Sequence, residues 1–134
     1  MKAAVYVGTQ QFEIKEVQTP KPGPKQILVQ IRYSAVCGTD VHGFLYDVVE
    51  HGKILGHEYS GTVCEVGSEV EKWKVGERVV GGGGTPPTGV VAGPATTEAR
   101  FNYRTMGFHN SKSGAYAEYI LMEEWQPIAI PEDV

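Results

Sequence analysis

The chain has 134 residues, of which 41% are hydrophobic and 21% charged, a composition that is typical of one globular domain. Its net charge is −4 and its lysine and arginine residues do not cluster, which disfavours nucleic-acid binding because that function needs concentrated positive charge. No apolar run approaches the roughly 20 residues of a membrane span, and the opening letters MKAAVYVG are too few for the apolar core of a signal peptide. We therefore expect a cytoplasmic protein that does not enter membranes.

Short strands dominate the expected secondary structure. The 17 glycines and 8 prolines favour many turns, and alternating apolar and polar residues favour strands between them. The predicted strands cover residues 1–7, 12–17, 26–36, 58–67 and 114–122, and a turn followed by a strand covers 73–82. The first two strands form a hairpin around residues 8–11. Gly61 lies within a strand and therefore indicates a bulge or a close approach of another chain segment.

Helix and loop signals complete the expected fold. Residues 39–46 are predicted to form a short helix, with Thr39 or Asp40 as its N-cap. No periodic pattern is present in residues 19–25, 81–114 and 127–134, which are predicted to be a proline-rich loop, a long functional or mobile loop and an extended tail. The sum is a single mostly β, barrel-like domain with one or two short helices.

The two cysteines, Cys37 and Cys64, are too few for a disulfide scaffold in a chain of this length. Spacing leaves one bridge between them possible, but without a signal peptide we expect reduced thiols. Cys64 alternates within the strand letters TVCEV and is interpreted as a core residue.

One short segment, CGTDVH at residues 37–42, gathers a thiol, a hydroxyl, a carboxylate and an imidazole where a strand gives way to a loop. His57 lies in LGHEYSG, immediately before the next strand. Zinc takes thiolate and imidazole ligands readily, so Cys37 and His57 could share an ion if these strand ends lie side by side. Taken singly, however, Cys37 could be a small buried apolar residue and His57 a core histidine, because their separation matches no zinc-finger spacing.

Several ordered motifs carry a resemblance to a known family. The segment GHEYSGTVCEVGSEV resembles the signature of the zinc-containing alcohol dehydrogenases of the medium-chain dehydrogenase/reductase superfamily, and CGTDVH, KVGERVV and SGAYAEYILM are similar to further family segments. The resemblance runs from MKAAVY to IPEDV. It implies that residues 1–134 form the amino-terminal GroES-like catalytic domain of an oxidoreductase, which polarises an alcohol or carbonyl substrate for hydride exchange with NAD or NADP. CGTDVH is most similar to the polyol and threonine dehydrogenase branch.

The resemblance also implies a metal site. Cys37 and His57 would be ligands of a catalytic zinc, and Glu58 would be a third protein ligand or would lie behind a bound water. Asp40 would accept a hydrogen bond from the second nitrogen of His57, which fixes the orientation of a ligating imidazole. Asp40 could equally cap the short helix, and both roles are compatible.

The resemblance further implies a proton relay. Thr39 would bind the substrate oxygen and pass its proton to His42, the outer end of the relay near solvent. An alcohol must lose this proton before hydride leaves its carbon, and a hydroxyl followed by an imidazole provides a path outward. The alternative for His42 is an exposed loop residue without a role, and for Glu58 a solvated charge.

The sequence departs from the family in three ways. Residues 81–114 contain no cysteine, so the four-cysteine structural zinc site of many members is absent there. VVGGGGTPP is not a dinucleotide-binding fingerprint, since prolines follow where a helix should begin. The chain stops at IPEDV, where family members continue into the Rossmann cofactor domain. NAD or NADP would therefore be bound only by a longer parent protein, and we expect this chain alone to be inactive.

Two other functions compete with this interpretation. A stand-alone GroES-like binding module would share the fold, since fold does not fix function. It would, however, give no purpose to the group of candidate site residues Cys37, Thr39, His42, His57 and Glu58. A zinc-free reductase of the same superfamily would lack the cysteine and the His–Glu pair that this chain carries. The sequence leaves the alcohol, the choice between NAD and NADP and the oligomeric state open.

Overall fold

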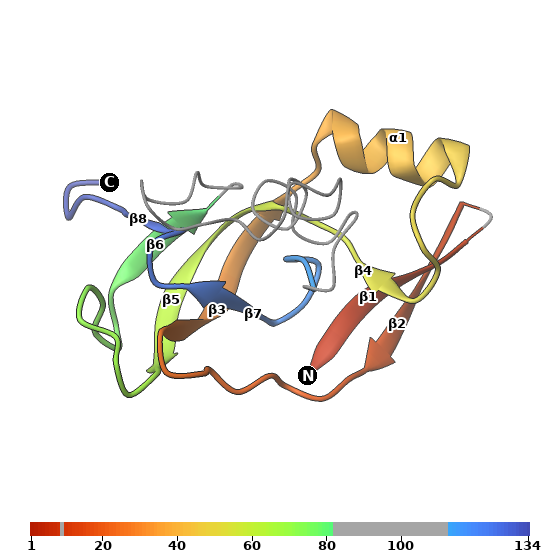
Figure 1. The fold of residues 1–134 in the computed structure, drawn as a ribbon. Coiled ribbons are helices and arrows are strands. Elements are labelled where there is room, and N and C mark those ends of the chain that lie inside the picture. Colours follow the sequence, from red (N-terminus) through yellow and green to blue (C-terminus); the bar gives the residue numbers. More distant parts are fainter. Residues whose placement is uncertain (9, 82–112) are drawn as a thin grey trace, which may run out of the picture.

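The computed structural model describes residues 1–8, 10–81 and 113–134, which form two β-sheets and a short helix (Figure 1). The elements in chain order are β1 Lys2–Gly8, β2 Gln11–Glu16, β3 Gln26–Ala35, α1 Gly38–Tyr46, β4 Lys53–Ile54, β5 Glu58–Val66, β6 Arg78–Gly81, β7 Tyr119–Glu123 and β8 Ile128–Ala129. The prediction of a mostly β domain with one or two short helices is confirmed for the described part of the chain.

A five-stranded sheet in the order β7-β3-β5-β6-β8 forms the larger part of the fold. Its pairings are all antiparallel. Successive side chains of a strand point to opposite faces of the sheet, so one face can pack on the core while the other meets solvent. The main core consists of buried apolar residues of these strands and their connections: Ile27, Val29, Tyr59, Val63, Trp73, Val79, Ala115, Ile120 and Met122. Trp73 also donates its indole N–H to the carbonyl of Glu124 at 2.6 Å, which satisfies its polar atom.

A three-stranded sheet in the order β2-β1-β4 lies beside the larger one. The predicted hairpin is confirmed, because β1 and β2 pair antiparallel from Lys2–Glu16 to Gly8–Gln11. Gly8 adopts a φ of 91° at the turn, which glycine accommodates without steric cost. The two sheets meet where Ala3 bridges Ala117 and the Ala4 N–H donates to the Tyr116 carbonyl at 2.7 Å.

Gly61 permits the close approach of β3 and β5 that the sequence indicated. A Cβ atom at this position would lie 2.2 Å from the carbonyl oxygen of Gln30 and 2.8 Å from Cγ1 of Val29. The register between the two strands also shifts between Ile31 and Tyr33, opposite this glycine. The pairing that places the ends of β3 and β5 together therefore depends on a residue without a side chain.

The structure corrects several predicted boundaries. The N-cap of α1 is Cys37, and neither Thr39 nor Asp40 occupies that position. The final predicted strand, residues 114–122, is a named strand only from Tyr119, because the preceding segment leaves the larger sheet and bonds to residues 2–4 of β1 and to residues 54–56 instead. Strand β4 was not predicted, and the extended tail includes β8, which pairs with β6. The predicted loop at 81–114 lies almost entirely outside the described residues.

No helix in the described ranges has the length and apolar character needed to cross a membrane.

Replacing Gly61 by alanine should lower the free energy of unfolding by about 1–3 kcal/mol, because the added methyl group overpacks the β3–β5 contact. Chemical denaturation followed by circular dichroism measures this change. Gly38→Ala is the matched control: nothing lies within 4 Å of its Cβ position, and alanine favours the helix that begins there. Equal stability of the Gly61→Ala variant and the unsubstituted chain would contradict the close-approach argument.

Candidate metal centre

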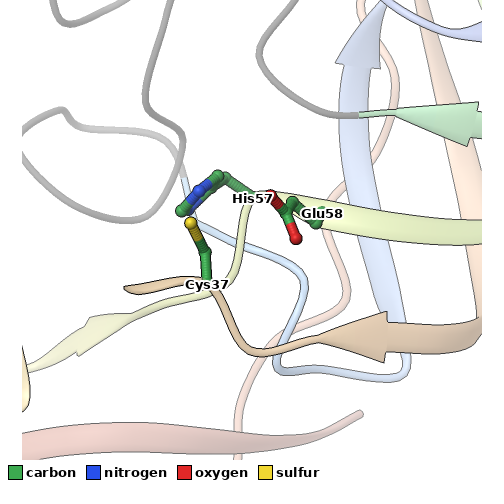
Figure 2. Close-up of side chains that lie close together, drawn as sticks. All are labelled: Cys37, His57 and Glu58. Carbon is green, nitrogen blue, oxygen red and sulfur yellow. The ribbon is translucent and has the colours of Figure 1, made fainter. Parts of the chain in front are cut away.

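The register of β3 and β5 brings the predicted metal ligands together. Ala35, the last residue of β3, pairs with Glu58, the first residue of β5. Cys37 follows two residues after Ala35, and His57 immediately precedes Glu58, so antiparallel pairing places both at the same end of the sheet. Figure 2 shows the Cys37 sulfur directed at the His57 ring, with Glu58 beside them at the start of its strand.

Three potential ligands form one cluster. One ligand atom each from Cys37, His57 and Glu58 lies within 4.8 Å of the other two. His57 is 8% exposed, Cys37 is half-buried and Glu58 is exposed, so the cluster opens toward solvent on one side. Zinc binds sulfur at about 2.3 Å and nitrogen at 2.0–2.1 Å, so small side-chain rotations would let these atoms reach a common ion. A soft thiolate with an imidazole and a carboxylate is a donor set that suits zinc.

Asp40 links the two segments that carry these residues. Its Oδ2 accepts the backbone N–H of Cys37 at 3.0 Å, which closes the first turn of α1. Its Oδ1 accepts the backbone N–H of Gly56 at 3.3 Å. The same oxygen lies 3.6 Å from Nδ1 of His57, an electrostatic contact that exceeds hydrogen-bond length, and this buried nitrogen has no hydrogen-bond partner. Both predicted roles of Asp40, helix capping and proximity to His57, are thus compatible with its position.

Interactions within the cluster lower the pKa of Cys37 and raise the pKa of His57. Asp40 raises the pKa of His57 to about 9 against the opposing effect of burial, and Cys37 acts in the same direction. Hydrogen bonds from Thr39, and then the nearby His57, lower the pKa of Cys37. Burial raises the pKa of Asp40, but His57 and the Cys37 N–H outweigh it and the net shift is downward. A metal cation would therefore have to displace the proton that His57 carries at neutral pH, while the lowered pKa of Cys37 favours the thiolate form that binds metals.

The two relay candidates lie on the first turns of α1. The Thr39 hydroxyl is 3.6 Å from the sulfur of Cys37 and is half-buried at the edge of the cluster. His42 is exposed and packs its ring against Tyr46, with ring centroids 4.6 Å apart. A spacing of three residues places Thr39 and His42 on the same face of the helix.

Tyr116 belongs to the cluster's surroundings and was not singled out by the sequence. Its backbone N–H donates to Leu55 at 2.9 Å, and its ring fills the space where a Cβ on Gly56 would lie, 2.6 Å away. Its hydroxyl donates to the Ala35 carbonyl at 3.4 Å, and burial followed by the Asp40 charge raises its pKa. The only sequence signal was a large aromatic residue within the small-residue letters GAYA.

The remaining cysteine and histidines lie elsewhere. Cys37 and Cys64 are both free, which agrees with the expected reduced thiols. Cys64 is half-buried and donates to the Leu28 carbonyl at 3.3 Å. His51 contacts Asp47 at 2.9 Å, away from the cluster, and His109 lies outside the described residues.

Comparison with known proteins assigns the family. The sequence model of one protein family, the alcohol dehydrogenase GroES-like domain, matches residues 23–132. The chain belongs to this family. The resemblance to zinc-containing alcohol dehydrogenases that the motifs carry is thereby confirmed, as is the GroES-like fold class.

The chain spans less than half the length of each of three relatives. L-threonine 3-dehydrogenase from Sinorhizobium fredii is 33% identical over 130 residues, which cover 90% of this chain and 36% of the relative. The structure of 2R,3R-butanediol dehydrogenase from Bacillus subtilis aligns with a TM-score of 0.80 and 26% identity over 99% of this chain and 41% of that one. The structure of a dehydrogenase from Sinorhizobium meliloti, assigned as zinc-binding and bound to NADP, aligns with a TM-score of 0.78 and 28% identity. The alignment covers 99% of this chain and 39% of that one. The GroES-like domain family thus recurs here within much longer dehydrogenases.

Replacing Asp40 by asparagine should lower the pKa of His57 from about 9 toward its ordinary value of 6.5, because the short-range interaction with the Asp40 carboxylate is the largest cause of the upward shift and the charge of Asp40 adds to it. NMR titration of the imidazole in metal-free protein measures the pKa of His57. Asp133→Asn, at an exposed residue outside the cluster, is the control and should leave this pKa unchanged. A raised histidine pKa stabilises the fold below about pH 6.5, and this contribution is lost as pH rises through 9. Asp40→Asn should consequently cost more stability at pH 6 than at pH 9.5, and an unchanged His57 pKa would contradict the pairing.

Proposed function

We propose that this domain is the amino-terminal catalytic half of a zinc-dependent alcohol dehydrogenase that uses NAD or NADP. The observation that carries the proposal is the cluster of Cys37, His57 and Glu58 at one end of a family-typical fold. Cys37 and His57 hold the ion, and Glu58 is the third protein ligand or stands behind a bound water. When bound, zinc supplies a Lewis acid that polarises the substrate oxygen and lowers its pKa.

The chain's own residues prepare and support this centre. Asp40 holds the backbone of Cys37 and Gly56 and keeps its charge near His57, so the thiol and the imidazole face each other before an ion arrives. Tyr116 packs against Gly56 and reaches the Ala35 carbonyl, which ties the same two segments from the other side. Thr39 hydrogen-bonds the substrate hydroxyl and relays its proton, accepting it while donating its own hydroxyl proton toward His42, which releases a proton to solvent.

A groove of about 440 Å³ adjoins the cluster and is the place for the substrate. Glu58 lines it together with Tyr33, Ala35, Tyr59, Ser60, Val80, Gly81, Gln126 and Ile128. Most of these side chains are apolar or aromatic, which suits the carbon skeleton of a secondary alcohol. The branch of polyol and threonine dehydrogenases is supported by the CGTDVH segment and by the similarity to L-threonine 3-dehydrogenases.

The nicotinamide cofactor would be bound by a Rossmann domain, which a longer parent protein would supply. The chain spans 36% of the length of the L-threonine 3-dehydrogenase that it matches, and no dinucleotide fingerprint occurs in its sequence. A stand-alone GroES-like binding module remains the second candidate, because the fold alone would serve it. Zinc content separates the two functions.

The chain should bind zinc weakly at one site, since it offers two firm ligands and an exposed carboxylate. Cys37→Ser or His57→Ala should weaken binding by more than about 100-fold, beyond the 10–100-fold cost of altering supporting residues. Competition with a chromophoric chelator measures the affinity. Cys64→Ser is the matched control, because it removes the other free thiol far from the cluster and should leave affinity unchanged.

Excess chelator should leave the domain folded at room temperature, as judged by circular dichroism, because its core does not depend on the ion. Zinc binding that survives in both Cys37→Ser and His57→Ala would refute the assigned ligands. Complete unfolding in chelator would show a structural metal in place of a catalytic one.

The 134-residue chain should reduce no NAD or NADP with any alcohol, because placing the nicotinamide ring against the substrate is worth about 7–11 kcal/mol of the barrier. In a longer chain that includes the cofactor domain, Thr39→Ala should retain zinc and lower turnover by about 10²–10⁴-fold, the usual contribution of acid–base catalysis. Thr39→Ser keeps the hydroxyl and should recover most of the rate. Full turnover in Thr39→Ala with full zinc would remove Thr39 from the mechanism.

A further inference from the structure

Strand β2 presents an unpaired edge on the smaller sheet. It pairs with β1 on one side only, as the outermost strand of the order β2-β1-β4 (Figure 1). All six of its residues, Gln11–Glu16, are exposed. Such an edge carries a row of free backbone N–H and C=O groups and is a ready template for another strand.

The other sheet edges among the described residues are less suitable for adding a strand. Strands β4 and β8 have only 2 residues each. Strand β7 has 5 residues that alternate between buried and half-buried, so its side chains are already committed to the core. β2 is therefore the longest and most accessible edge in the part of the chain that the structure describes.

We propose that two copies of this domain associate through their β2 strands, which pair antiparallel about a two-fold axis at Ile14. The two three-stranded sheets then become one continuous six-stranded sheet. A two-fold axis is the commonest symmetry of soluble oligomers, and it requires a surface that is complementary to itself.

The charges of β2 meet this requirement in one register. With Ile14 opposite Ile14 of the second copy, Glu13 lies opposite Lys15 and Lys15 lies opposite Glu13. Glu13 and Lys15 already form an ion pair of 2.9 Å within one strand, so the four side chains of the dimer alternate in sign around a square. Opposite charges directly across two strands stabilise their pairing.

Neighbouring registers are opposed by the same charges. Directly opposed residues of two antiparallel strands lie on the same face of the sheet. The two-fold axis must therefore pass through a residue, and the nearest alternative registers move it by one residue, to Glu13 or to Lys15. Centring the axis on Glu13 sets two glutamates opposite each other, and centring it on Lys15 does the same with two lysines. Charges on an edge strand usually prevent pairing; here they favour the register centred on Ile14 over both of its neighbours.

Ile14 adds an apolar contact at the axis. Its side chain is 72% exposed and lies on the same face of β2 as Phe12, which is 37% exposed and stacks on Phe44 of α1 at a centroid distance of 5.6 Å. Pairing would remove the two Ile14 side chains from water together. A six-residue strand gives a small interface, so the dimer should form at high protein concentration and dissociate on dilution.

Sedimentation velocity over a range of protein concentrations tests the proposal. The unsubstituted chain should shift from its chain mass of 14.6 kDa toward twice that value as concentration rises. Glu13→Lys gives a strand with two lysines, and Lys15→Glu gives one with two glutamates. Each variant alone should weaken association by at least tenfold, because every cross-strand pair then carries like charges. Circular dichroism should show that both remain folded, since both positions are exposed.

Mixing the two variants is the decisive step. Glu13→Lys chains and Lys15→Glu chains place only opposite charges across the axis, so the mixture should dimerise although neither component does alone. Glu71→Lys, at an exposed residue outside β2, is the control and should associate like the unsubstituted chain. A chain that stays monomeric at all concentrations, a dimer that persists in either single variant, or a mixture that stays monomeric would each overturn the proposal.

Discussion

The carboxylate of Asp40 is the interaction on which the candidate centre depends. It is 3% exposed and is shared among the N–H of Cys37, the N–H of Gly56 and the charge of His57. A buried carboxylate is costly unless such partners surround it, so the carboxylate in turn requires the start of α1 and the loop before β5 to be close. The two strand ends that the sheet register brings together are in this way held at a fixed distance.

The sequence predicted the strands where alternation was regular and missed what depended on tertiary contacts. The β1–β2 hairpin and strands β3 and β5 followed from local pattern, and in β5 the alternation of the sequence matches an alternation of buried and more exposed residues. Strand β4 has only 2 residues and exists because it pairs with β1, so no local signal could reveal it. The N-cap was misplaced because cysteine is rarely considered for this position, whereas the Asp40 carboxylate acts three residues later, from inside the first turn.

For the candidate site, the motif named the residues but not what holds them. Cys37, His57 and Glu58 were singled out from the sequence, and the structure places them in one cluster. The motif did not reveal that Gly56 has a φ of 91° and leaves room for the Tyr116 ring, because both facts concern contacts between distant segments. Tyr116 is separated from Gly56 by the whole region outside the described residues, so its role could emerge only from the fold.

The charge arrangement of the cluster explains how such a site can exist before a metal is bound. A metal site usually gathers groups that repel one another without their ion, which would strain the fold. Here the pKa of His57, raised to about 9, keeps its ring protonated at neutral pH, and this positive charge lies between the Asp40 carboxylate and the Cys37 thiol, whose pKa values are both lowered. The main apolar core contains none of the three candidate ligands Cys37, His57 and Glu58. We therefore expect occupancy of the site and stability of the fold to be separable, as the proposed catalytic metal requires.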